Sequence, residues 1–220
     1  MVKGGEMKRG NKVMLLTLFC VLSAVFFCGC GGSGPGSPGS TECENFGLIC
    51  SVTITPVYLG SNTDNVDAAE DVCDPGPPAV FEKFTDHGAN VAVSLQLLNP
   101  TTTLTPSSLF IESYTIEYRR SNDSIGSPSI QSDTRFISFS VTPPTGTDIS
   151  TVTQSLIFVD IPRKDKYYQD MLSGVFGATT GSPSFINNYT AIYTIQGQIN
   201  GTKVTIIGTK SFSIGDYNNC

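Results

Sequence analysis

The chain has 220 residues, with 13 basic and 19 acidic side chains and a net charge of −6 at neutral pH. Proteins that bind nucleic-acid backbones cluster Lys and Arg against the phosphates, so this acidic balance argues against nucleic acid as a partner. Thr, Ser, Ile, Val, Tyr and Phe are prominent, whereas Trp is absent. Because most of these residues favour strands, the composition predicts an all-β protein.

The N-terminal segment has the pattern of an export signal. Basic residues at positions 8, 9 and 12 precede an apolar run over Val13–Phe27. A basic start, about 7–15 apolar residues and then small residues are typical of a secretory signal peptide. A membrane-spanning helix needs about 20 apolar residues, so this run is short for a permanent anchor.

The end of this run, Phe27-Cys28-Gly29-Cys30, resembles the lipobox of bacterial lipoproteins. In that family a small residue precedes a cysteine that receives a lipid and becomes the N-terminus. The resemblance implies cleavage after Gly29, a lipid with palmitate-type acyl chains on Cys30, and a membrane anchor in the bacterial cell envelope. The outer membrane is the first expectation, with the domain facing the periplasm or the surface. An ordinary cleaved signal peptide is the alternative.

Three segments follow from this interpretation: a signal peptide over residues 1–29, a tether over 30–42 and a folded domain over 43–220. The tether is rich in Gly, Ser and Pro, which makes it flexible. Four basic residues and one acidic residue lie in the signal peptide, so the 191 residues that remain carry a net charge of −9. This length suits one well-buried domain.

Seven segments of the domain alternate apolar and polar residues, as half-buried strands do. One short amphipathic helix is expected over Pro162–Phe176, and a bulge is expected at Gly208. Asn200-Gly201 predicts a hairpin turn, because both residues tolerate a positive φ. The expected strands are Ser51–Leu59, Asn90–Leu98, Ile111–Arg119, Arg135–Thr142, Val152–Ile161, Tyr189–Ile199 and Lys203–Ile214.

Seven strands separated by turn residues, with one short helix before strand six, resemble the immunoglobulin or fibronectin type III sandwich. The resemblance rests on the number and spacing of strands and covers residues 51–217. It implies a single immunoglobulin-like β-sandwich of about seven strands.

Four cysteines lie in the domain: Cys43, Cys50, Cys73 and Cys220. An even number in an exported domain predicts two disulfides, which can be connected in three ways. In such a sandwich the first strand can pair parallel to the last, so that both end at the same pole. Cys73 follows the first strand and Cys220 follows the last, which favours the pairs Cys73–Cys220 and Cys43–Cys50. A zinc site is the weaker alternative, because the paired spacing of zinc ligands is missing.

The segment 60–88 after the first strand is long, acidic and rich in Pro, so we expect an irregular loop. Its carboxylates could supply several of the about 6–8 oxygen ligands of calcium, although the EF-hand alternation is missing. A solvated acidic loop is the simpler interpretation. A calcium- or glycan-binding module centred on this loop is therefore the alternative function, with these candidate ligands: Asp64, Asp67, Glu70, Asp71 and Asp74.

No motif in the sequence indicates catalysis. His87 is the only histidine, and no GxSxG elbow supplies a nucleophile for a Ser–His–Asp triad. We expect an exposed loop histidine, no enzymatic activity and no cofactor. The favoured hypothesis is an envelope lipoprotein of structural or protein-interaction type, which binds a protein partner through its loops or an edge strand.

Overall fold

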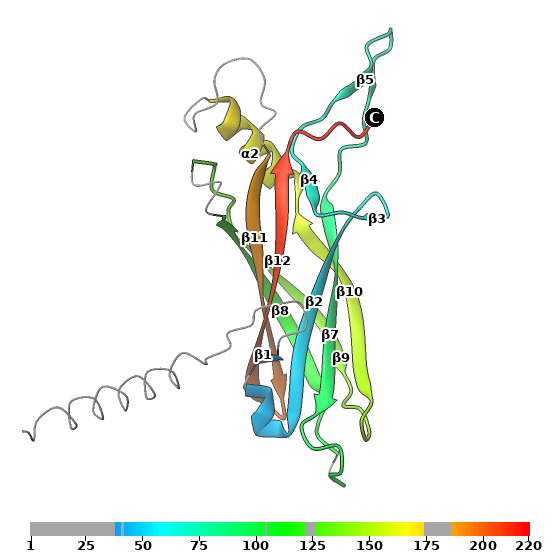
Figure 1. The fold of residues 1–220 in the computed structure, drawn as a ribbon, viewed down its shortest axis with the longest axis vertical. Coiled ribbons are helices and arrows are strands. Elements are labelled where there is room, and N and C mark those ends of the chain that lie inside the picture. The colour runs from blue at the N-terminus through cyan, green and yellow to red at the C-terminus, as the bar shows by residue number, and fades with distance from the viewer. Residues whose placement is uncertain (1–37, 41, 104, 122–125, 174–185) are drawn as a thin grey trace, which may run out of the picture. The chain divides into compact units, whose positions relative to one another are not determined.

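The computed structural model describes residues 38–40, 42–103, 105–121, 126–173 and 186–220 (Figure 1). The expected signal peptide, the lipobox and Cys30 lie outside these residues, as does most of the expected tether. In the described part of the chain, no helix has the length and apolar character needed to cross a membrane.

Strands dominate the fold and form two five-stranded sheets and a two-stranded ribbon. Sheet A has the order β1-β2-β7-β10, with β3 beside β2, and sheet B has the order β4-β12-β11-β8-β9. The strands of sheet A are β1 (Pro38–Ser40), β2 (Leu48–Tyr58), β3 (Ser61–Asn62), β7 (His87–Leu97) and β10 (Ile149–Val159). Those of sheet B are β4 (Asn65–Asp67), β8 (Leu109–Arg120), β9 (Asp133–Val141), β11 (Asn187–Ile199) and β12 (Thr202–Gly215). The ribbon pairs β5 (Val72–Asp74) with β6 (Val80–Phe81).

One continuous apolar core lies between the two sheets. The central strands bury alternate residues, as the period of two requires. Aromatic rings join the sheets: Phe158 of β10 stacks on Tyr193 of β11, with 6.4 Å between ring centroids. The hydroxyl group of Tyr193 donates to the carbonyl of Ile157, 3.0 Å away, so its polar atom is satisfied inside the core.

Two helical segments complete the described fold: the 3₁₀ helix η1 (Glu42–Phe46) and α2 (Ile161–Leu172). The N-cap of α2 is Asp160, whose side chain accepts a hydrogen bond from the backbone N–H of Arg163. Pro162 lies in the first turn, where a missing N–H costs nothing. The inward face of α2 buries Tyr167 and Met171. The expected helix is therefore present, and its last residues lie outside the described ones.

All seven expected strands are present, as β2 and β7–β12. The expected single sandwich of seven strands is wrong in its count, because short strands extend both sheets and form the ribbon. Segments of two or three residues are too short to show a period in the sequence. The segment 60–88 is consequently less irregular than expected: it contains β3–β6, and β7 begins at His87.

The first long strand does not pair with the last. β2 pairs with β7, and the segment after β2 crosses to sheet B, where β4 pairs parallel to β12. Gly208 also differs from expectation, because the pairing of β11 with β12 has no bulge there. A Cβ atom at Gly208 would lie 2.8 Å from Cγ1 of Val52, so this glycine allows the two sheets to approach closely.

Candidate functional site

Figure 1 shows the pole of the sandwich where β2 ends and β7 begins. Buried polar side chains gather at this pole. Asp67, Glu82, His87 and Lys164 are all buried there, and we call these four residues the buried polar cluster. They come from β4, the segment after β6, the start of β7, and α2. The cluster therefore joins four separate parts of the chain.

Lys164 projects from α2 into this pole and has no exposed surface. Its Nζ donates to the carbonyl of Thr85 at 2.7 Å and lies over the rings of Tyr58 and Phe84, at 4.7 and 4.6 Å from their centroids. Burial lowers the pKa of Lys164 to about 8, while nearby carboxylates, Asp67 first, oppose that shift. One hydrogen bond and two ring faces thus replace the water around this ammonium group.

His87 is fully buried, so the expectation of an exposed loop histidine is wrong. Its ring stacks on Tyr58 at 5.3 Å and packs against Phe158 at 5.7 Å. Nε2 lies 3.1 Å from the carbonyl of Thr63, which makes it the protonated nitrogen of a neutral ring. Nδ1 has no hydrogen-bond partner among the described residues. Burial lowers the pKa of His87 to about 4, because a charged ring would be poorly solvated there.

Asp67 and Glu82 bind the C-terminal segment. Asp67 accepts hydrogen bonds from the backbone N–H of Tyr217 at 3.1 Å and from the side-chain amide of Asn219 at 2.8 Å. Glu82 accepts one from the backbone N–H of Asn219, also at 2.8 Å. Burial, and then hydrogen bonding to Glu82, raises the pKa of Asp67 to about 7. The two carboxyl groups therefore position the end of the chain.

The Cys73–Cys220 disulfide lies in the same region and joins the ribbon to the last residue. The second disulfide, Cys43–Cys50, links η1 to β2. These are the two pairs that the sequence favours. Disulfides persist in oxidising compartments, so the domain is suited to an exported environment.

A network of ion pairs beside the cluster fixes the start of α2 against β9. Asp160 pairs with Arg163 at 2.6 Å and with Arg135 at 3.0 Å. Asp133 pairs with the same two arginines, at 2.6 Å from Arg135 and 3.3 Å from Arg163. Two carboxylates and two guanidinium groups thereby neutralise one another at a helix N-terminus, and none of the four is left as a separate charge.

The buried polar cluster is arranged to hold elements together. A nucleophile or general base must reach its substrate, but Lys164 and His87 have no exposed surface. The hydrogen bond of His87 goes to a backbone carbonyl and not to Ser or Asp, so His87 is not part of a Ser–His–Asp triad among the described residues. The hydrogen bonds of this cluster link α2, the 60–86 segment and the C-terminal segment.

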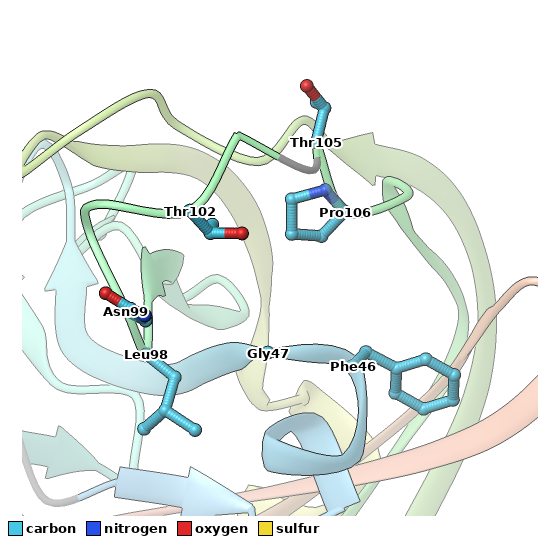
Figure 2. Close-up of a pocket in the computed structure, with 7 residues that line it drawn as sticks. All are labelled: Phe46, Gly47, Leu98, Asn99, Thr102, Thr105 and Pro106. Atoms are coloured by element: carbon cyan, nitrogen blue, oxygen red, sulfur yellow. The ribbon is translucent and has the colours of Figure 1, made fainter.

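A pocket of about 320 Å³ lies at the opposite pole, where β7 ends and β2 begins (Figure 2). The backbone N–H of Leu98 donates to the carbonyl of Gly47 at 2.9 Å, which joins the two loops that form it. None of the described residues that line the pocket is titratable. They are Phe46, Gly47, Leu98, Asn99, Thr102, Thr105 and Pro106.

The five candidate calcium ligands are not gathered into one site in the described part of the chain. Asp64 forms an ion pair with Lys210 of β12 at 2.8 Å, and Asp67 is buried against the C-terminal segment. The other three lie at or near the surface of the same excursion: Glu70, Asp71 and Asp74.

Sequence reasoning missed Lys164 and Glu82 altogether. Each is a charged residue whose type predicts exposure. One signal was available for Lys164: in the helical spacing of α2 it shares a face with Tyr167 and Met171, which are buried. No comparable pattern marks Glu82, whose burial depends on the C-terminal segment that covers it.

No family model matches the chain, and no curated protein matches it. Among solved structures, the crystal structure of a protein from Archaeoglobus fulgidus has 9% sequence identity and a TM-score of 0.39, over 76% of this chain and 97% of that one. The solution structure of a protein described as late embryogenesis abundant (LEA) has 11% identity and a TM-score of 0.35, over 97% and 94% of the two chains. Neither likeness is close enough to carry an argument about function.

Proposed function

We propose that this chain is a lipid-anchored protein of the bacterial cell envelope, with a structural or protein-binding role. The observation that carries the proposal is the pair of disulfides in a domain that follows a lipobox-like segment. Both features belong to exported proteins. The lipid on Cys30 holds the domain at the membrane, and the tether to residue 42 separates the two.

The character of the domain supports a role without catalysis. Its buried ionisable groups contact backbone carbonyls, aromatic rings and, in the case of Asp67 and Glu82, one another. Several exposed apolar residues lie on the ribbon, where Val72 is opposite Phe81 and both are about half exposed. A small apolar surface on a disulfide-linked ribbon suits contact with a protein, and the net negative charge does not suit anionic lipid or nucleic acid.

The anchor is tested by expressing the full chain in a bacterium that processes lipoproteins and measuring the intact mass of the membrane fraction. We expect the mass of a chain that begins at Cys30, with an acylated glyceryl group and two disulfides. Cys30→Ala should remove the lipid mass and release the protein from the membrane.

Cys28→Ala is the matched control, because the lipobox family accepts Ala at that position. It should leave the lipid mass and the membrane fraction unchanged. An unmodified mass for the wild-type chain would overturn the proposal, as would loss of the lipid in Cys28→Ala together with its retention in Cys30→Ala.

A further inference from the structure

Each sheet has two edges, and in the described residues three of the four are short or interrupted. β1 and β3, at one edge of sheet A, have three and two residues, and β4 at one edge of sheet B has three. β9, at the other edge of sheet B, carries Asp133 and Arg135 and has an irregular register against β8. Short strands, charges and bulges all hinder the pairing of a sheet edge with another chain.

β10, the remaining edge of sheet A, has none of these features over Ile149–Ile157 (Figure 1). It pairs with β7 on one side, and the register is continuous through these nine residues. The whole strand contains no charged residue and no Pro. Because alternate residues of an antiparallel edge strand direct their N–H and C=O groups away from the sheet, β10 presents an unprotected row of hydrogen-bonding groups.

On the solvent-facing side of β10, the order of residue types is nearly the same when read from either end of the strand. It consists of Ile149, Thr151, Thr153, Ser155 and Ile157, of which the first four are exposed. An antiparallel partner runs in the opposite direction, so pairing two copies about Thr153 places like residues together. Thr153 lies opposite itself, Thr151 opposite Ser155, and Ile149 opposite Ile157.

We propose that the chain forms a two-fold symmetric dimer by antiparallel pairing of β10 with the β10 strand of a second copy, centred on Thr153. Hydroxyl pairs and apolar pairs at directly opposite positions stabilise such a ladder. A two-fold interface brings the same surface of each copy together, so a charge at the position on the axis, Thr153, would face its own sign. β10 has none, although the chain as a whole is acidic. The dimer goes beyond the proposed envelope role and does not depend on the lipid.

The test compares two lysine variants of the full chain by sedimentation over the micromolar range. Thr153→Lys places two like charges at the two-fold axis and should convert the dimer to a monomer. Thr53→Lys is the matched control, since Thr53 and Thr153 both lie opposite Ala92 on the exposed face of sheet A. It adds the same charge two strands from the edge and should remain dimeric. Circular dichroism verifies that both variants are folded.

Cysteine variants give a second measurement that depends on geometry. Thr153→Cys should form a reducible covalent dimer on mild oxidation, because directly opposite Cβ atoms in an antiparallel pair lie within reach of a disulfide. Thr53→Cys should not. The inference is overturned if the wild-type chain stays monomeric throughout the range, if Thr153→Lys is still a dimer, or if both cysteine variants cross-link equally. Pairing of this edge with a different protein while the chain remains monomeric would also overturn it.

Discussion

His87 lies between residues that are typical of a loop, Asp86 and Gly88, yet it is completely buried. Local sequence describes its neighbours along the chain, whereas its burial comes from Tyr58 and Phe158, which are distant in sequence. Its charge state follows from those rings. A cation would have no hydrogen-bond acceptor for Nδ1–H among the described residues and would lie near the ammonium group of Lys164. His87 is therefore a neutral part of the core.

This burial predicts a loss of stability in acid. The pKa of His87 is about 4 in the folded state, against an ordinary value of 6.5 in the unfolded chain. The unfolded state therefore binds a proton first as the pH falls. The contribution of His87 to stability is complete above pH 6.5, declines from there, and is lost by pH 4. The pKa difference corresponds to about 3 kcal/mol.

His87→Phe keeps the stacked ring and removes the titration. Denaturant unfolding at a series of pH values should show the wild type losing about 3 kcal/mol relative to this variant between pH 6.5 and 4. Asp67, whose folded pKa is raised to about 7, makes both proteins more stable as the pH falls, which is opposite to the effect of His87. Comparing the wild type with the variant cancels this contribution of Asp67. Parallel stability curves for the two proteins would contradict the prediction.

Among the elements, the pairing of β8 with β11 depends on a glycine. The register of this pair shifts between Gln196 and Gly197, opposite the segment that contains Phe110 and Ile111. A Cβ atom at Gly197 would lie 2.3 Å from the carbonyl oxygen of Phe110, which belongs to the backbone and cannot rotate away. The irregular pairing of these two central strands therefore requires a residue without a side chain at position 197.

Gly197→Ala should destabilise the domain by about 1–3 kcal/mol or more, because overpacking at a backbone atom displaces a strand. Gly88→Ala, also within a long strand, is the control: its Cβ would lie 3.5 Å from the nearest backbone oxygen, an ordinary contact. Thermal unfolding of the two variants should show a clear loss for the first and little change for the second. Equal melting temperatures would show that the strand pairing can relax around the new methyl group.

At the scale of the whole molecule, the C-terminal segment is held by a covalent bond as well as by polar contacts. Cys220 joins Cys73 across a sequence separation of 147 residues, whereas the Cys43–Cys50 bond spans seven. In the chain-entropy model a longer closed loop restricts the unfolded state more strongly. The long-range bond is therefore expected to be the larger of the two contributions to stability.

Replacing Cys73 and Cys220 together by Ala should lower the free energy of unfolding by about 4–5 kcal/mol. Asn219→Ala keeps the disulfide and removes the side-chain amide hydrogen bonds to Asp67 and to the carbonyl of Tyr217, so it should cost about 1–2 kcal/mol. Denaturant unfolding of both variants without reductant measures the two losses of stability and tests whether the double cysteine variant loses more. A loss for the double variant no larger than that for Asn219→Ala would mean that the polar contacts alone hold the segment.

The sequence alone predicts the long strands, the helix and the number of disulfides, because each has a local or countable signal. The choice of disulfide pairs rested on pairing of the first strand with the last, whereas in the structure the segment after β2 reaches β12 through β4. Alternating apolar residues mark the strands, Asn200-Gly201 marks the last hairpin, and four cysteines limit the pairing to three arrangements. The lipobox-like segment is likewise a local pattern, and it stays a prediction.

Only the tertiary structure decided the buried polar cluster, the crossing of the chain from sheet A to sheet B, and the unprotected edge of β10. Lys164 and Glu82 have side chains that are usually exposed, and the burial of both, like that of His87, is imposed by residues far away in the sequence. The edge of a sheet is likewise a property of strand order, which periodicity does not contain. Local sequence patterns indicate which side of its own strand or helix each residue occupies. The burial of charged groups in the core and the exposure of a sheet edge depend instead on which elements pack together.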